Sequence, residues 1–202
     1  LLKKIVKYNK KNKFNILESG LYNHVRDLYC LTLILTHLKK NKKKIKVLDF
    51  GSNLAPYSNL VNKINLKNFK ISIYDPFNKK DYSRVDNIEI FKNKKLLKKR
   101  WDIINFGSSI QYIDNLNILN DINFTSTITI LITHTPISLS KSYIANQKNN
   151  KNLEQNIYSF DLFKKFFNRK KFKLYFKSRN ENKYISAKTK FKTFSMNLLF
   201  LK

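Results

Sequence analysis

Cysteine, glycine and proline are nearly absent from this chain, which holds one, three and three of them among 202 residues. The single cysteine, Cys30, excludes an internal disulfide framework and indicates a reducing compartment, so we expect a cytoplasmic protein. The longest apolar run, LYCLTLILTHL at 28–38, is too short to cross a bilayer. We therefore expect no transmembrane segment, and the length favours one domain over residues 1–202.

Acidic residues are also scarce, with 13 Asp and Glu against 41 Lys and Arg and a formal net charge of +28. Such a surplus points to a nucleic acid or an anionic membrane. Lys far outnumbers Arg, however, and Arg rather than Lys gives the planar bidentate contacts that read bases. Asn and Ile are abundant too, as drift towards A/T-rich codons would produce without selection for binding. We therefore expect no nucleic-acid partner, and peripheral contact with an anionic membrane stays open.

The order of apolar segments predicts an α/β fold. Apolar residues recur at helical spacing from Glu18 to Lys40, inside a leading helical segment at 1–44. Strands that alternate with helices predict a mostly parallel sheet with helices on both faces, in a core at 45–202. The five predicted strands are short apolar or β-branched segments at 45–50, 69–75, 87–91, 101–107 and 127–134.

The last third of the chain predicts a sheet edge. A helix around 159–168 precedes two further strand candidates at 171–178 and 191–202. No crossover helix fits between these two segments, so we expect them to pair antiparallel at the edge of the sheet. The polar stretch NQKNNKNLEQN at 146–156 predicts a mobile loop.

Two of the three glycines and all three prolines gather at one edge of the predicted sheet. Gly51 and Gly107 stand at the carboxyl ends of the first and fourth strands. Pro56, Pro76 and Pro136 are expected to follow strands one, two and five. Backbone shape therefore matters at this edge, which is where open α/β sheets bind ligands.

The stretch KVLDFGSNLAPYS at 46–58 contains Asp49-Phe50-Gly51, the tripeptide that holds magnesium in protein kinases. The chain has no room for a kinase small lobe upstream of it. As a strand, turn and helix the stretch places Gly51 in a tight turn, and Asp75 ends the next strand where a carboxylate can bind both hydroxyls of a ribose. Because G-x-G-x-x-G is absent, the site favours S-adenosyl-L-methionine, which carries no pyrophosphate, over a dinucleotide.

The motifs VLDFGSNLAPYS, YDPF, WDIINFGSSIQYIDN, ITILITHTPIS and SYIANQ follow the order and approximate spacing of class I S-adenosylmethionine-dependent methyltransferases. More narrowly, the chain resembles a group of bacterial proteins of this type, largely uncharacterised, that are associated with surface-glycan biosynthesis. The resemblance implies a Rossmann-like class I methyltransferase fold and a methyltransferase that uses S-adenosyl-L-methionine. It also implies a small-molecule or glycan-related acceptor, methylated at oxygen.

The resemblance assigns roles to individual residues. The substrate-binding residues are Gln111, Tyr112 and Gln147. The cofactor-binding residues are Asp49, Phe50, Gly51, Ser52, Asn53, Asp75, Gly107, Ser108 and Ser109.

Two residues are candidates for catalysis. His134 ends the fifth strand at the ligand edge and could act as a general base, since imidazole titrates near neutrality. A strand-end histidine bound to a neighbouring loop is the competing interpretation. Tyr112 could shape the pocket or pack under the next helix. No Cys, His and carboxylate cluster has metal-ligand spacing, so we expect no metal.

Two alternatives belong to other classes. Ser52 and Ala55 stand where the resembling group has glycines, so a cofactor-binding protein without catalysis is the first. A basic nucleic-acid-binding module is the second, with FKKFFNRKKFKLYFKSR at 163–179 as its candidate surface. That segment sorts equally well into the core and solvent faces of a helix and a strand.

Overall fold

The computed structural model describes residues 23–40, 44–51, 68–77, 82–85, 88–114, 116–147, 150–180 and 191–202. Its helices are α2 (Asn23–Lys39), η2 (Lys94–Lys98), η3 (Ile110–Tyr112), η4 (Leu116–Asp121) and α4 (Phe160–Arg169), the η elements being 3₁₀ turns. Its strands are β1 (Ile45–Phe50), β2 (Phe69–Tyr74), β3 (Tyr82–Val85), β4 (Ile88–Phe91), β5 (Ile103–Gly107), β6 (Thr129–Ser138), β7 (Tyr143–Gln147), β8 (Asn150–Ser159), β9 (Lys173–Asn180) and β10 (Thr193–Leu201).

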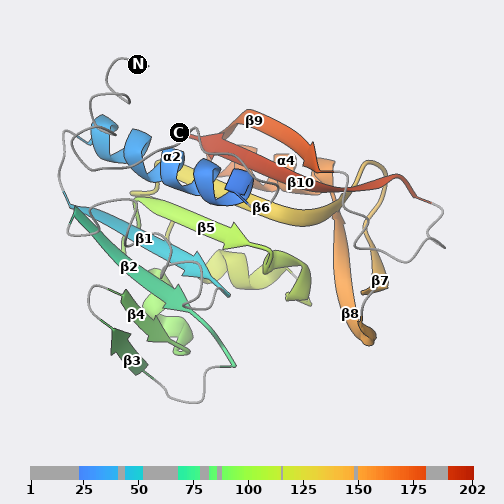
Figure 1. The fold of residues 1–202 in the computed structure, drawn as a ribbon, viewed down its shortest axis with the longest axis horizontal. Helices are drawn as coiled ribbons and strands as arrows, with labels where there is room; N and C mark the ends of the chain where they lie inside the picture. Colours follow the sequence, from blue (N-terminus) through green and yellow to red (C-terminus); the bar gives the residue numbers. More distant parts are fainter. Residues whose placement is uncertain are drawn as a thin grey trace.

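One mixed sheet organises the molecule (Figure 1), in the order β3-β4-β2-β1-β5-β6-β10-β9. The strands β4, β2, β1, β5 and β6 run parallel to one another. Strand β10 lies antiparallel between β6 and β9. The predicted parallel sheet and antiparallel edge pair are thus confirmed. The strand order changes direction at β1, because β2 lies on one side of it and β5 on the other. Open α/β sheets usually bind their ligands at such a point, outside the carboxyl ends of the strands.

Helices cover both faces of the sheet, as predicted. Successive side chains of a strand point to opposite faces of the sheet. The buried residues therefore form two clusters, one on each face. Helix α2 contributes Leu33 and Ile34 to one cluster. Helix α4 contributes Phe163 and Phe167 to the other. Within the second cluster, an aromatic row formed by Phe91, Tyr74, Phe50 and Phe106 crosses four strands near their carboxyl ends, with ring centroids 4.9–5.6 Å apart.

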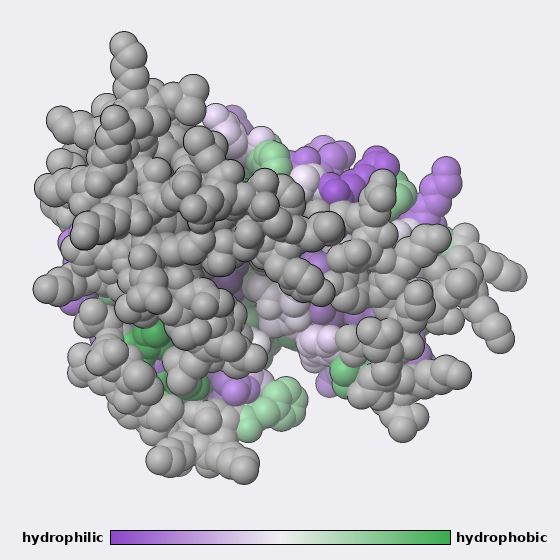
Figure 2. All heavy atoms as spheres, in the orientation of Figure 1, coloured by the Kyte–Doolittle hydropathy of each residue, from purple (hydrophilic) through white to green (hydrophobic). Residues whose placement is uncertain are grey.

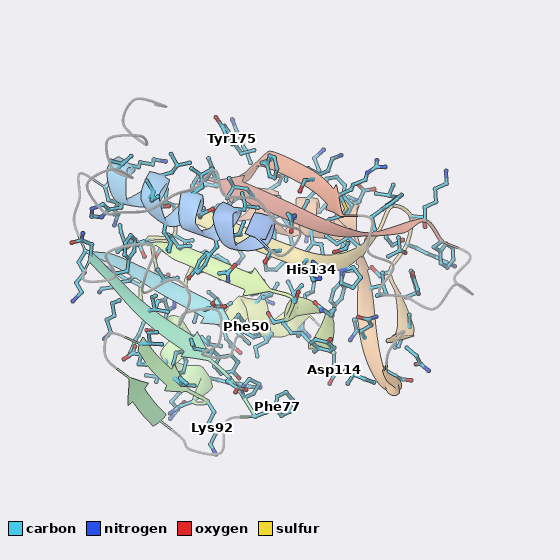
Figure 3. All side chains as sticks on the ribbon, in the orientation of Figure 1. Phe50, Phe77, Lys92, Asp114, His134 and Tyr175 are labelled. Carbon is cyan, nitrogen blue, oxygen red and sulfur yellow. The ribbon has the colours of Figure 1, made fainter. Side chains whose placement is uncertain are left out.

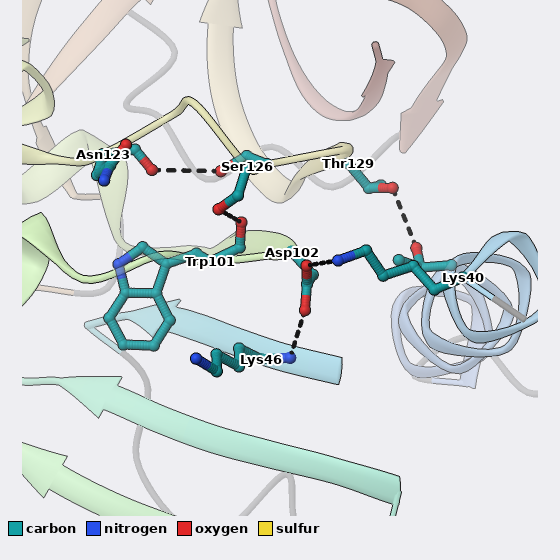
Figure 4. A network of polar contacts seen from close by, with 9 residues as sticks. Lys40, Lys46, Trp101, Asp102, Asn123, Ser126 and Thr129 are labelled. Atoms are coloured by element: carbon teal, nitrogen blue, oxygen red, sulfur yellow. Dashed lines mark hydrogen bonds and ion pairs between the residues drawn. The ribbon is translucent and has the colours of Figure 1, made fainter. Parts of the chain in front are cut away.

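A polar network fixes the opposite edge, where the parallel strands begin (Figure 4). The Asp102 carboxylate accepts from Lys40 Nζ at 2.5 Å and from the backbone N–H of Lys46 at 2.8 Å. The hydroxyls of Thr36 and Thr129 form a buried hydrogen bond at 3.0 Å. The end of α2 is therefore tied to the starts of β1, β5 and β6.

Three features differ from the sequence prediction. The stretch 146–156 lies largely in the strands β7 and β8, which pair antiparallel, so the predicted mobile loop is wrong. Strand β6 continues to Ser138, where β8 joins it, so Pro136 lies inside the strand instead of after it. Strand β3 forms an additional antiparallel edge. Polar residues are frequent in the hairpin sequence, in YIANQ and NKNLEQNIYS, so it lacked the regular apolar alternation that predicts a strand.

The basic segment 163–179 sorts by burial. Phe163, Phe167 and Phe172 are buried, whereas the cations are exposed (hydrophilic side chains gather over β9 in Figure 2). Trp101 is buried and donates from Nε1 to the Leu97 carbonyl. None of the helices within the described ranges combines the length and hydropathy that a bilayer-spanning helix needs.

Candidate functional site

Gly51 forms the turn after β1. Its φ of 73° lies in the left-handed region, which glycine adopts without steric cost. Its N–H donates to the Tyr74 carbonyl at 2.7 Å, which ties the turn to the end of β2. A Cβ built on Gly51 would lie 2.7 Å from Cβ of Ser109, so any larger residue collides with the turn after β5. The backbone at this position is therefore both exposed and closely packed.

Asp75 follows β2 directly. Its N–H donates to the Phe91 carbonyl at 3.0 Å, and its Oδ1 accepts from the N–H of Phe77 at 2.9 Å. These two bonds hold the carboxylate beside the Gly51 turn. Oδ2 has no hydrogen-bond partner among the residues that the structure describes. Phe77 is 87% exposed, so an uncovered ring stands next to this carboxylate.

The turn after β5 brings two serines to the same edge. The N–H of Ser108 donates to the Thr133 carbonyl, and its Oγ donates to the His134 carbonyl, both at 2.9 Å. Ser108 has a φ of 53°, an uncommon value for a residue with a side chain. Ser109 is buried against Gly51, and within the described part of the chain its Oγ lacks a partner. The turn thus leaves a buried hydroxyl next to Gly51.

His134 lies in β6 at the level of the Ser108 turn. Its φ is 52°, and its N–H donates to Oδ1 of Asn197 at 2.9 Å. The imidazole is partly buried, and this burial lowers its pKa from the ordinary value of 6.5. At neutral pH the ring is therefore uncharged and able to accept a proton. Figure 3 shows His134, Asp114 and Phe77 around the carboxyl ends of the central strands.

The 3₁₀ turn η3 is held by the β7–β8 hairpin. Tyr158 and Asn156 of β8 both donate to the Ile113 carbonyl. Burial, together with the charge of Asp114, raises the pKa of Tyr158 to about 12, so its hydroxyl remains a donor at neutral pH. This contact fixes the end of η3, where Tyr112 is 40% exposed.

Polar residues continue into the strands that support the site. Asp49 and Asn105 are neighbours across β1 and β5, and both are buried. Oδ1 of Asn105 and Oε1 of Gln111 lack partners among the described residues. Buried polar atoms are normally hydrogen-bonded, so such oxygens suit a ligand that donates hydrogen bonds. Phe50 is buried, and its side chain packs in the aromatic row.

The structure brings most predicted residues to one edge. Gly51, Asp75, Ser109 and His134 are linked through direct contacts of their turns. Ser52 and Asn53 lie outside the described residues. Gln147 belongs to β7, on the far side of β6 from β1 (Figure 1). Within the described ranges, no three His, Cys, Asp or Glu side chains gather as metal ligands.

Sequence reasoning missed four residues of this region. Asn105 and Asn197 are single amides inside apolar strands, in IINFG and FSMNLLFL, and that interruption was a usable signal. A buried amide inside a strand requires a hydrogen-bond partner, so such a residue is a candidate for a structural or ligand contact. Asn156 and Tyr158 carried no such signal, because their strand was not predicted.

No family model and no curated protein matches the sequence. Solved structures match in fold. A methyltransferase from Mesorhizobium loti that depends on S-adenosylmethionine is 7% identical, with 91% of this chain and 100% of that chain covered and a TM-score of 0.56. Magnesium protoporphyrin IX methyltransferase from Synechocystis, solved with S-adenosylmethionine, is 10% identical, with 100% and 98% covered and a TM-score of 0.52.

A third solved structure that matches in fold is a methyltransferase with another acceptor. The 1,6-didemethyltoxoflavin-N1-methyltransferase from Burkholderia thailandensis, solved with S-adenosylhomocysteine, is 7% identical, with 99% and 86% covered and a TM-score of 0.51. These proteins share the Rossmann-like class I methyltransferase fold with this chain. At such low identity the likeness concerns the fold alone, since one fold carries many functions.

Proposed function

We propose that this chain is a methyltransferase that binds S-adenosyl-L-methionine at the carboxyl edge of its sheet. The observation that carries the proposal is the Gly51 turn, with its φ of 73° and its contact with Ser109. A turn of this kind lets a ligand approach the backbone closely. It lies beside Asp75, whose carboxylate is the proposed ligand of the ribose hydroxyls.

The donors and acceptors of the site fit this cofactor. S-adenosylmethionine presents an ammonium group and two ribose hydroxyls, all of which donate hydrogen bonds. The described edge offers acceptors in return, namely Oδ2 of Asp75, Oγ of Ser109 and Oδ1 of Asn105. A pyrophosphate would need several backbone N–H groups from a glycine-rich turn, and the sequence has one glycine there. Asp49, Ser52, Asn53, Gly107 and Ser108 complete the proposed cofactor site.

The bound cofactor would supply an electrophilic methyl group. The chain's own contribution is to align an acceptor with it, exclude water and take up a proton where the acceptor must lose one. His134 is the proposed base, because burial keeps its imidazole neutral. Gln111, Tyr112 and Gln147 are proposed to bind the acceptor, a small molecule or glycan-related compound with a reactive hydroxyl. The proposed location is the cytoplasm.

Calorimetric titration with S-adenosylhomocysteine and, separately, with NAD⁺ tests the cofactor. We expect binding of the first ligand only. Labelled S-adenosylmethionine offered with a panel of sugar hydroxyl acceptors then tests transfer. His134→Asn should retain cofactor binding and lose transfer, since Asn tolerates a positive φ but cannot act as a base. Binding without transfer to any acceptor would favour the alternative of a cofactor-binding protein without catalysis.

A further inference from the structure

Asn197 stands opposite an irregularity in β6. The register pairs Met196 with Thr135 and Leu198 with Ile132, so Thr133 and His134 together face the single residue Asn197. One extra residue on a strand is a β-bulge, which redirects side chains and is common next to active sites. Asn197 is only 3% exposed, in a strand of otherwise apolar neighbours.

Both ends of the Asn197 amide are used. Oδ1 accepts from the N–H of His134 at 2.9 Å, and Nδ2 donates to Oγ of Ser178 at 3.0 Å. The amide therefore joins β6 to β9 across the strand that separates them. An apolar residue of similar size would leave the His134 N–H without this acceptor. A carboxylate would keep the acceptor but lose the donor towards Ser178.

The backbone of His134 is held from its other side as well. Ser108 donates from Oγ to the His134 carbonyl at 2.9 Å. A histidine at φ 52° is uncommon, and such conformations persist where the surroundings impose them. Here Asn197 binds the N–H of His134, and Ser108 binds its carbonyl. Ser108 belongs to the same turn as Ser109, which contacts Gly51. The conformation of His134 is thus connected to the proposed cofactor turn.

We propose that Asn197 is a positioning residue, which holds His134 in its left-handed conformation so that the imidazole stays at the carboxyl edge as the proton acceptor. The role of His134 as proton acceptor rests on the proposed methyltransferase function. The control of the His134 conformation by Asn197 does not depend on that function. A proton acceptor at this position implies that the methyl acceptor loses a proton during transfer, so the methyl acceptor is a hydroxyl or a protonated amine.

Nuclear magnetic resonance of the full chain tests the proposal. The three-bond coupling between the amide proton and Hα of His134 distinguishes φ 52° from an extended strand. His134→Asn identifies the imidazole signal among the three histidines. In Asn197→Ala we expect the coupling to rise to the strand value and the His134 pKa to move towards 6.5. Asn197→Asp should restore the small coupling, because its carboxylate still accepts from the His134 N–H.

Ser178→Ala is the matched control, since it removes only the outer hydrogen bond and should leave the coupling as in the wild type. An unchanged coupling and pKa in a folded Asn197→Ala would overturn the proposal, as would an equal change in Ser178→Ala. If Asn197→Ala fails to fold, Asn197→Asp decides: a strand-type coupling in that variant contradicts the proposal. S-adenosylhomocysteine titration of the same wild-type sample shows separately whether the proposed function holds.

Discussion

Gly51 and Ser109 lie in contact across the carboxyl edge of the sheet, so closely that a Cβ on Gly51 would stand 2.7 Å from Cβ of Ser109. The first residue follows β1 and the second follows β5, which are adjacent parallel strands. The contact therefore joins the two turns that flank the point where the strand order reverses. Open α/β sheets bind their ligands at such a point.

Replacement of Gly51 by alanine should damage the turn. The left-handed conformation costs a residue with a side chain about 1–2 kcal/mol, and the collision with Ser109 adds to this. We expect Gly51→Ala to lower the free energy of unfolding by about 2 kcal/mol and to weaken S-adenosylhomocysteine binding at least tenfold. Urea unfolding and calorimetry measure both quantities.

Gly107→Ala provides the matched control. A Cβ there would lie 3.3 Å from Nδ2 of Asn105, a tight but adjustable contact, and Gly107 has no positive φ. We expect a smaller loss of stability in this variant. Equal losses in the two glycine variants would contradict the role given to the Gly51 turn.

Tyr158→Phe should loosen η3. The variant removes one of the two hydrogen bonds that reach the Ile113 carbonyl and leaves the bond from Asn156 in place. We expect a loss of about 1 kcal/mol in the free energy of unfolding, measured in urea at pH 7. The double variant with Asn156→Leu should lose more than the sum of the single variants, because only then is the carbonyl left without either donor. Strict additivity would speak against this shared contact.

Glu89 should make stability depend on pH in the acid range. Burial alone would raise its pKa, but the hydrogen bond from Ser72 and the charge of Lys70 outweigh burial and place the pKa below the ordinary 4.5. The unfolded chain therefore takes up a proton at higher pH than the folded chain. The stabilisation by Glu89 is complete above pH 4.5 and disappears as the pH falls through the folded pKa.

Urea unfolding of the wild type and of Glu89→Gln between pH 3 and pH 7 checks this expectation. We expect the wild type to be more stable at pH 7 by about 1–2 kcal/mol and the difference to shrink at low pH. Ser72→Ala, which removes the hydrogen bond at 2.5 Å, should reduce the pH dependence. A difference that stays constant with pH would refute the assignment.

His134 should produce a second pH effect, near neutrality. Burial lowers its pKa in the folded chain, whereas the unfolded chain titrates near 6.5. The contribution of neutral His134 to the free energy of unfolding is therefore fully present above pH 6.5. It is lost as the pH is lowered towards the folded pKa, because the unfolded chain binds the proton more readily. His134→Asn should abolish this decline, as measured by thermal unfolding between pH 5 and pH 8. A decline of the same size in the variant would assign the effect elsewhere.

The sequence predicted the sheet and the turns at its carboxyl edge because rare residues marked them. Gly51 and Gly107 lie at the ends of β1 and β5 as expected, and a composition poor in glycine made these two conspicuous. Asp75 likewise follows β2. Such features are local, since a strand, its turn and the next residue are contiguous in sequence.

Features that depend on distant contacts were not predictable in this way. The left-handed conformation of His134 is imposed by Asn197, which is 63 residues away in the chain. The β7–β8 hairpin contains many polar residues, and Tyr158 joins it to η3 by a hydrogen bond to the Ile113 carbonyl. Its pattern resembled a loop, because the apolar alternation that signals a strand requires one buried face along its length.

Asp75 offers the most direct test of the proposed cofactor site. Calorimetric titration of S-adenosylhomocysteine should be run on the wild type, on Asp75→Asn and on Asp75→Ala. The asparagine retains the Oδ1 acceptor that holds the Phe77 N–H, so it keeps the turn and removes only the carboxylate. We expect clear binding by the wild type and a loss of at least tenfold in Asp75→Asn, about 1.4 kcal/mol or more. Folded wild-type protein that does not bind at millimolar ligand, or binding that is unchanged in both variants, would contradict the account.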